Sequence, residues 1–300
     1  MEYTNLPDMQ GLATLKAVVE LGGVAEAGRA LHIGQPAVTK RLRTLDGCYG
    51  VPLMLRKGRR LVLTPAGEKV YAFARLALEH QRALLDDLAT LRAGLNRLRL
   101  DVTSSIGEHM LPDLLLRFAD SYPEYRIESR MDYTRHIQMR LATGLSDLAL
   151  LELAPDHPDI LVQRWLDDEV VLVCGPSHPL RDREFITVDD LGGLRFVLRE
   201  GQSAMRVTLD KALQDIGIDQ LPIVMEVGST DTIIEMLERG SHVSFLPRFA
   251  VEESLRTGSL HHLRIQGLRI NRTLWIARTR ENLNNPAAEA FIRLLRDNSV

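Results

Sequence analysis

Apolar residues recur at helical spacing in two short segments near the start of the chain. The positions on the two apolar faces are Ala27, Ala30, Leu31, Val38, Leu42 and Leu45. Between the segments lies the run 32–34, and Pro36 stands where a second helix begins, so its missing amide costs nothing. The pattern predicts a helix-turn-helix with its second helix over residues 35–48. We expect Gly34 to relax the backbone of the turn.

A basic β-hairpin is predicted after the second helix. Residues 56–60 read Arg-Lys-Gly-Arg-Arg, a turn rich in cations, and residues 61–63 read Leu-Val-Leu, a strand returning from it. A hairpin of this kind can lay cations along a nucleic-acid backbone or in a minor groove.

A long helix is predicted from Thr64-Pro65 onwards, because Pro favours the first helical position and residues 68–93 contain neither Gly nor Pro. A heptad period joins Val70, Ala74, Ala77, Gln81, Leu84, Leu88 and Leu91. Such a seam favours pairing with the same helix of a second chain. A helix packed on its own domain is the alternative. Residues 92–97, which include Gly94, are predicted to form a hinge.

Beyond residue 97, apolar runs of strand length alternate with amphipathic stretches of helical length. The expected strands are 98–103, 125–131, 147–153, 170–174, 195–198, 224–227, 243–246 and 273–277, and the expected helices are 112–121, 136–143, 205–216, 230–239, 247–256 and 287–297. This alternation predicts α/β layers with mainly parallel sheets. A body of roughly 200 residues can bury a sound core and divide into two subdomains.

Charge is segregated along the chain. Residues 1–64 hold nine basic and five acidic residues, an excess of four positive charges, although the whole chain has a formal net charge of −3. A charge run alone is usually a solvated face, but here it coincides with a helix-turn-helix and a hairpin, which indicates DNA binding. Gln and Arg can read base edges, and Thr, Lys and Arg can hold phosphates. The candidate DNA contacts are Gln35, Pro36, Thr39, Lys40, Arg41, Arg43, Arg56, Arg59 and Arg60.

Motifs across nearly the whole chain resemble the LysR-type transcriptional regulators. The residues that carry this resemblance are 31–39 (LHIGQPAVT), Leu42, Leu45, 50–53 (GVPL), Arg56 and 63–67 (LTPAG). The resemblance implies an α/β fold class in three parts. These are an N-terminal winged helix-turn-helix (1–64), a dimerising linker helix (65–92), and a two-subdomain α/β effector domain (93–300) like the type 2 periplasmic binding proteins. Subdomain one is expected at 97–163 and 268–300, and subdomain two at 164–267.

The same resemblance implies several partners. These are a dyad-symmetric double-stranded DNA operator, RNA polymerase, a small polar or anionic effector, and further copies of the chain as a homodimer through the linker helix and a homotetramer. The expected mechanism is that the effector controls DNA bending and contact with the polymerase. Three departures from the family pattern, residues 23–25 (Gly-Val-Ala), Gly28 and Gly34, predict a marginally stable DNA-binding head.

Three loops after predicted strands carry hydroxyl groups at expected helix starts. In open α/β sheets, ligands sit beyond the carboxyl ends of strands, near helix N-termini. The candidate effector-binding residues are Ser104, Ser105, Arg199, Ser203, Ser229 and Thr230. Ordinary N-capping explains the Ser and Thr residues equally well, and Arg206 is an alternative cation to Arg199. The composition fits a sugar and a small organic acid equally.

Recognisable catalytic and metal-binding motifs are missing: there is no G-x-S-x-G, H-E-x-x-H, P-loop or G-x-G-x-x-G. We therefore expect no catalytic residue, metal or cofactor, and interpret His109, near Ser105, as structural or ligand-facing. No apolar run approaches about 18 residues and no secretory signal is seen, so we expect a cytoplasmic protein without a membrane partner. A solute-binding protein and an enzyme are the alternative functions. The basic head argues against the first, and the missing motifs argue against the second.

Overall fold

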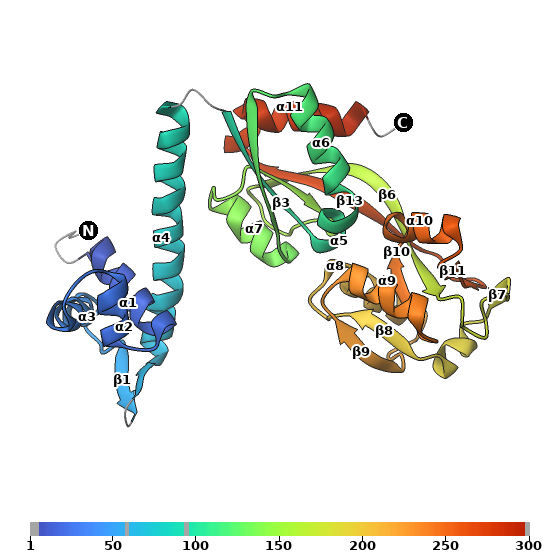
Figure 1. The fold of residues 1–300 in the computed structure, drawn as a ribbon, viewed down its shortest axis with the longest axis horizontal. Helices are drawn as coiled ribbons and strands as arrows, with labels where there is room; N and C mark the ends of the chain where they lie inside the picture. Colours follow the sequence, from blue (N-terminus) through green and yellow to red (C-terminus); the bar gives the residue numbers. More distant parts are fainter. Residues whose placement is uncertain (1–5, 58–59, 93–95, 298–300) are drawn as a thin grey trace. The chain divides into compact units, whose positions relative to one another are not determined.

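The computed structural model describes residues 6–57, 60–92 and 96–297. The chain divides into two compact units, Met1–Arg92 and Ala93–Val300, which are considered separately (Figure 1). No helix in the described ranges is both long and apolar enough to cross a lipid bilayer.

The first unit is a winged helix-turn-helix, which confirms the predicted fold class. Its elements are α1 (Met9–Leu21), α2 (Val24–Ala30), α3 (Gln35–Tyr49), the hairpin β1 (Met54–Lys57) and β2 (Arg60–Leu63), and α4 (Pro65–Arg92). The sequence analysis did not predict α1. Asp8 caps the start of this helix, since its carboxylate accepts a hydrogen bond from the amide of Gly11 at 2.6 Å.

The turn between α2 and α3 departs from the expectation for Gly34, which was wrong. Gly34 has an extended backbone, with φ −68° and ψ 152°, and stands directly before α3. The left-handed residue is His32, with φ 53°, a conformation that few non-glycine residues adopt. Gly28 allows the turn to pass closely, because a Cβ atom there would lie 2.8 Å from the carbonyl oxygen of Ile33. Gly28 therefore lowers the helix propensity of α2 but allows the turn to pack closely against the helix.

The start of α4 is fixed to the hairpin. Thr64 Oγ1 accepts a hydrogen bond from the amide of Gly67 at 2.9 Å and donates one to the carbonyl of Pro52 at 2.9 Å. A Cβ atom at Gly67 would lie 1.9 Å from the carbonyl oxygen of Leu53, so only glycine fits without displacing the backbone. The hairpin and α4 thus form one rigid junction.

The predicted heptad seam on α4 has two environments. Val70 and Ala74 are buried against Leu12, Leu15 and Leu45 of their own unit, so this part of the seam does not need a partner helix. Further along, the side chains of Leu84, Leu85 and Leu88 are 58%, 60% and 44% exposed. The exposed apolar stripe therefore lies in the second half of the helix.

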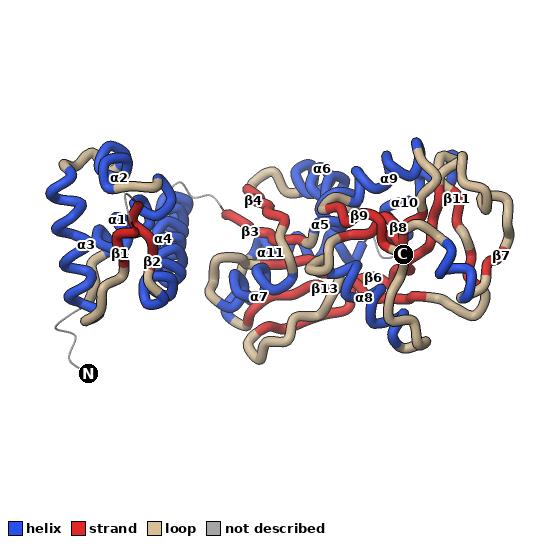
Figure 2. Tube along the Cα trace, turned by 90° about the horizontal axis from the view of Figure 1, so that it is seen from below, coloured by secondary structure: helices blue, strands red, loops and turns tan. Residues whose placement is uncertain are grey.

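The second unit is built around one continuous sheet flanked by helices (Figure 2). Its strands are β3 (Asn96–Val102), β4 (Tyr125–Met131), β5 (Leu148–Leu151), β6 (Ile160–Cys174), β8 (Phe196–Arg199), β9 (Ile223–Val227), β10 (Val243–Pro247), β11 (His261–His262) and β13 (Ile270–Thr279), with β7 (Phe185–Ile186) and β12 (Arg264–Ile265) forming a separate pair. Its helices are α5 (Ser104–His109), α6 (Leu111–Ser121), α7 (Thr134–Ala142), α8 (Ala204–Gln214), α9 (Thr230–Arg239), α10 (Arg248–Thr257) and α11 (Pro286–Asp297), with short 3₁₀ turns at Asp189–Gly193 and Glu281–Asn284.

The sheet is mixed rather than mainly parallel, which corrects the expectation. The strand order is β4-β3-β5-β13-β6-β10-β8-β9. Pairings within the two outer groups are parallel, whereas β6 and β13 pair antiparallel with their neighbours and with each other. Figure 1 shows β6 and β13 running from one half of the unit to the other. These two strands therefore connect the two halves.

Alternation along the strands builds a core on each face of the sheet. In β5, Leu148 and Leu150 join the cluster under α6 and α11, while Ala149 and Leu151 join the cluster under α7. The second half has two clusters of its own, one including Leu209 of α8 and the other Ile233 of α9. This period of two is expected of strands covered by helices on both faces.

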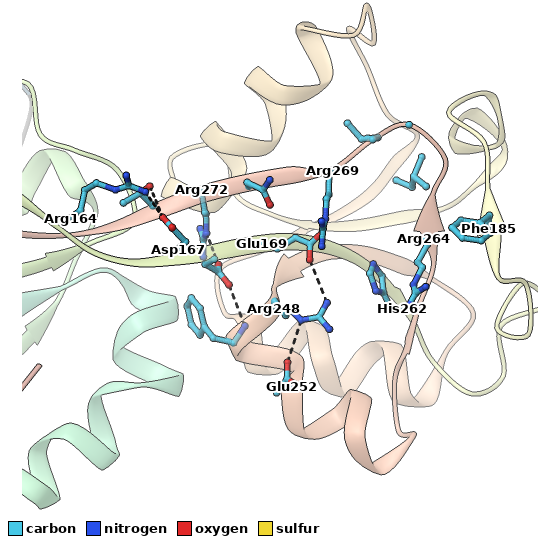
Figure 3. Close-up of a pocket in the computed structure, with 17 residues that line it drawn as sticks. Arg164, Asp167, Glu169, Phe185, Arg248, Glu252, His262, Arg264, Arg269 and Arg272 are labelled. Carbon is cyan, nitrogen blue, oxygen red and sulfur yellow. Dashed lines mark hydrogen bonds and ion pairs between the residues drawn. The ribbon is translucent and has the colours of Figure 1, made fainter. Parts of the chain in front are cut away.

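A hollow of about 1420 Å³ lies beside β6 and β13 and is lined by charged side chains (Figure 3). Arg248 and Arg269 both contact Glu169, at 3.4 and 3.0 Å. Arg272 is buried and pairs with Asp168 and Glu152, each at 2.7 Å. Because these cations have carboxylate partners, the hollow is better described as a network that fixes the crossing strands than as an anion site.

Arg272 holds the centre of this network. Its side chain and those of Glu152 and Asp168 are 3–5% exposed, and the guanidinium lies over the ring of Phe249 at 5.7 Å. Burial raises the pKa of Asp168 above its ordinary value even though Arg272 favours the charged form. Removal of Arg272 would leave two buried carboxylates without their cation.

We predict that Arg272→Met lowers the unfolding free energy of the second unit by about 3–5 kcal/mol, the usual cost of breaking a buried ion pair. Both tryptophans, Trp165 and Trp275, lie in this unit, so urea unfolding followed by tryptophan fluorescence reports on it selectively. Arg239→Met is the matched control, because its pair with Glu235 is largely exposed and should contribute less than about 1 kcal/mol. Equal, small losses in the two variants would contradict the role of Arg272.

Candidate functional sites

One face of α3 gathers predicted DNA contacts. Pro36, Lys40 and Arg43 follow each other at spacings of four and three residues, so their side chains lie on one face of the helix. Gln35 and Thr39 flank this row, and all of these positions except the half-buried Thr39 are exposed. The opposite face holds the buried Val38 and Leu45. A helix of this kind presents polar and cationic groups as a major groove requires.

Arg41 stands apart from this face. It lies three residues after Val38 and four before Leu45, which places it beside the buried side of the helix. Its Nη2 donates a hydrogen bond to Oε1 of Gln10 on α1 at 2.5 Å. The structure therefore turns Arg41 towards α1, a placement that composition alone did not indicate.

The hairpin carries the remaining predicted contacts. Arg56 is exposed on β1, paired in register with Leu61. Arg60 belongs to β2, opposite Lys57. The side chain of Arg60 and the whole of Arg59 lie outside the described residues, so their candidate role stays a prediction.

In the second unit, Ser105, Arg199 and Thr230 meet where the two halves approach each other. All three side chains are buried. The hydroxyl oxygens of Ser105 and Thr230 are 3.4 Å apart, and Arg199 Nη1 donates a hydrogen bond to Thr230 Oγ1 at 3.0 Å. Three of the predicted residues, from three different segments, therefore form one cluster.

Ser203 and Ser229 cap helices, as the alternative interpretation expected. Ser203 accepts a hydrogen bond from the amide of Arg206 at 3.2 Å, and Ser229 accepts one from Thr232 at 3.4 Å. Ser203 and Ser104 nevertheless line the same small hollow as Arg199, whereas Ser229 does not. Arg206 points elsewhere, since it pairs with Asp210 and Glu226 at 2.8 and 3.0 Å.

The charge of Arg199 is matched by its neighbour Glu200. Two hydrogen bonds join them, at 2.9 and 3.0 Å, and Tyr133 donates a third bond to Glu200 at 3.0 Å. Burial alone would lower the pKa of Arg199, but the contacts with Glu200 outweigh it and raise that pKa. Likewise, burial would raise the pKa of Glu200, yet its hydrogen bonds from Arg199 hold it below the ordinary value. An anionic ligand must therefore compete with Glu200 for Arg199.

The hollow between the halves has a volume of about 10 Å³, room for about one water molecule. Sequence reasoning missed several of its lining residues: Thr103, Asp132, Tyr133, Thr134 and Glu152. Among the described residues, the hydroxyl groups of Thr103 and Thr134 have no hydrogen-bond partner. Buried hydroxyls without partners are groups to which a bound polar molecule could form hydrogen bonds.

These missed residues follow the same rule as the predicted ones. β3 and β5 run parallel, as do β3 and β4, so their carboxyl ends lie at one edge of the sheet. Asp132, Tyr133 and Thr134 come directly after β4, and Glu152 comes directly after β5. Application of the rule to the expected strand 125–131 would have found Asp132, Tyr133 and Thr134, whereas Thr103 and Glu152 fell inside the expected strands 98–103 and 147–153.

Two family models together match nearly the whole chain. Residues 9–68 match a bacterial regulatory helix-turn-helix protein model of the lysR family, and residues 93–299 match the LysR substrate binding domain. A probable RuBisCO transcriptional regulator of Cyanophora paradoxa is 31% identical over 300 residues, which cover 97% of this chain and 92% of that protein. A protein of the same description from Chlorokybus atmophyticus is 32% identical over 289 residues, covering 93% of this chain and 91% of the relative.

Solved structures share the fold. Full-length CbnR, determined with its target DNA, has a TM-score of 0.75 at 22% identity and covers 97% of this chain and 99% of its own. The regulatory domain of CcmR from Synechocystis PCC6803, determined with 2-PG, has a TM-score of 0.62 at 23% identity, covering 68% of this chain and 97% of its own. The helix-turn-helix, the effector-domain fold and both family matches agree: this chain belongs to the LysR family, as a DNA-binding transcriptional regulator with an effector-binding domain.

Proposed function

We propose that two copies of the chain pair through α4 and present their α3 helices to a dyad-symmetric DNA operator. The apolar stripe of Leu84, Leu85 and Leu88 supports this pairing, since burial of apolar surface contributes about 25 cal/mol per Å². A helix-turn-helix dimer can read two half-sites about one helical turn apart, or multiples of a turn. The DNA-binding part is assigned to residues 1–64 and the dimerising helix to 65–92.

On α3, we assign base and phosphate contacts to Gln35, Pro36, Thr39, Lys40 and Arg43. The wing residues Arg56, Arg59 and Arg60 hold the DNA backbone. Arg41 supports the fold of this surface through Gln10 and contributes less to DNA affinity. Two dimers associate into a homotetramer, bend the DNA and contact RNA polymerase, and the protein acts in the cytoplasm by binding rather than catalysis.

Residues 93–300 sense a small polar or anionic effector in the cleft between 97–163 with 268–300 and 164–267. The observation that carries this proposal is the pair of buried hydroxyls, Thr103 and Thr134, which face the hollow without partners. Ser104, Ser105, Arg199, Ser203 and Thr230 provide further polar contacts, while Ser229 acts as the cap of α9. Solved regulators of this fold were determined with 2-PG and with shikimate, which supports a small-molecule effector.

For DNA binding, we predict that Arg43→Ala weakens affinity for a selected operator by about 1–3 kcal/mol, because Arg43 is exposed on the same face of α3 as Pro36 and Lys40. The operator is obtained by selection from random duplexes, and affinity is measured by fluorescence anisotropy across a salt series. Arg41→Ala on the same helix is the matched control and should have the smaller effect. The reverse ranking of the two variants would refute the assignment of this face.

For dimerisation, we predict that Leu84→Asp lowers self-association at least tenfold, because it places charge in the apolar stripe of α4. Sedimentation velocity of the full chain over a range of concentrations measures the effect. Val207→Asp, which changes an apolar side chain on α8 that is 43% exposed, is the control. A dimer that is unchanged in Leu84→Asp would show that α4 is not the main interface.

For effector binding, a thermal-shift screen of the full chain against sugars, sugar phosphates and small carboxylates should identify a ligand. Thr103→Val and Thr134→Val should each weaken its affinity by roughly 10-fold or more, the effect of a lost hydrogen bond to a charged group. Neither hydroxyl has a protein partner, so both variants should keep the stability of the parent. Thr143→Val is the control on an exposed part of the same unit. A ligand that binds both variants with parental affinity would occupy another site.

A further inference from the structure

Three potential metal ligands meet beside the Ser105–Thr230 contact. Glu108 and His109 lie at the end of α5, and Asp231 lies in the first turn of α9. Nε2 of His109 is 3.4 Å from Oδ1 of Asp231 and 3.9 Å from Oε2 of Glu108. The three ligand atoms all lie within 4.8 Å of one another. One half of the second unit therefore supplies two of the ligands, and the other half supplies the third.

His109 supplies the one nitrogen ligand of this cluster. Its side chain is 14% exposed, and its Nε2 atom is buried without a hydrogen-bond partner among the described residues. A buried ring nitrogen in this condition costs free energy unless it gains a hydrogen-bond partner or a metal. The ring of His109 makes an edge contact with Phe249, with centroids 6.5 Å apart.

The carboxylates are placed differently from each other. Glu108 Oε2 accepts a hydrogen bond from the amide of Thr230 at 3.3 Å, which fixes it against the start of α9. Asp231 is 64% exposed, so its carboxylate can adjust to an ion. A combination of imidazole and carboxylates suits Zn²⁺, and an outer hydrogen bond to a ligand is the usual means of orienting it.

We propose that Glu108, His109 and Asp231 form a divalent metal site, suited best to Zn²⁺, that joins α5 to α9. Around tetrahedral zinc with bonds of about 2.0–2.2 Å, neighbouring ligand atoms lie about 3.3–3.5 Å apart. The His109–Asp231 distance of 3.4 Å already meets this requirement, and Glu108 needs a small approach. The fourth position stays open to water or another ligand.

Bound metal would act on the conformation of the second unit. The ion gains its full set of ligands only when α5 and α9 are close, so its binding energy favours that arrangement over a separated one. This role goes beyond effector binding in the hollow, because none of the three ligands lines that hollow.

The test is metal binding by the full chain after chelator treatment, without DNA or effector. Zn²⁺ is titrated calorimetrically, and Co²⁺ is titrated by its visible absorption, which reports tetrahedral coordination. His109→Gln and Asp231→Asn should each weaken Zn²⁺ affinity by more than about 10-fold, since even a change outside the ligand shell has such an effect. Asp231→Asn changes an exposed side chain and should therefore fold as the parent does.

His136→Gln is the matched control. Nδ1 of His136 lies 2.7 Å from Oδ1 of Asp132, a histidine–carboxylate pair in the same unit that is not part of the three-ligand cluster. This variant should keep parental Zn²⁺ affinity. Failure of the parent to bind Zn²⁺, or equal affinity of the parent and Asp231→Asn, would overturn the metal site and leave the effector proposal untouched.

Discussion

The pairing of β6 with β13 is the constraint on which the second unit depends. Both strands lie in the middle of the one continuous sheet, where β13 also pairs with β5 and β6 also pairs with β10. They stay hydrogen-bonded to each other from Ile270↔Val170 to Thr279↔Ile160, with an irregularity between Leu274 and Trp275. Charged side chains nevertheless lie buried where these two strands pair. These charges are stabilised because Arg272 forms ion pairs with both Glu152 and Asp168. Glu152 also lines the small hollow beside Arg199, so this ion-pair network extends from the crossing strands to that hollow.

Periodicity predicted the parts of the fold whose apolar residues face a core. The helix-turn-helix, the wing and the outer strands follow this rule, and they lie close to the predicted positions. The first ten residues of β6 were missed because the segment contains Gln163, Arg164 and Asp167, which do not form an apolar run. Where β6 crosses between the halves, ion pairs and strand hydrogen bonds hold the segment in place of apolar contacts with a core. No local signal in the sequence marks that substitution.

The candidate sites were partly predictable for similar reasons. Hydroxyls after strands located Ser105 and Thr230, but only the folded chain shows that they meet across 125 positions. The spacing of Arg41 from Val38 and Leu45 could have separated it from Arg43. By contrast, the pairing of Arg199 with Glu200 and Tyr133 depends on tertiary placement and was out of reach. The type of a side chain suggests a role, but whether its charge is free to bind a ligand depends on the residues that surround it in the folded chain.

Contacts between the halves have a further consequence for the speed and strength of effector capture. Tyr133 bonds to Glu200, Arg135 bonds to Gln202 at 2.9 Å, and Thr230 meets Ser105, so these contacts hold the two halves together beside the small hollow. If the effector binds where we propose, these bonds must open before it can enter. Its apparent dissociation constant equals the intrinsic one divided by the open fraction, so each ~1.4 kcal/mol of closure weakens apparent binding about tenfold. For an effector bound in this hollow, the threshold concentration would therefore depend on the contacts between the halves as well as on the effector's own contacts.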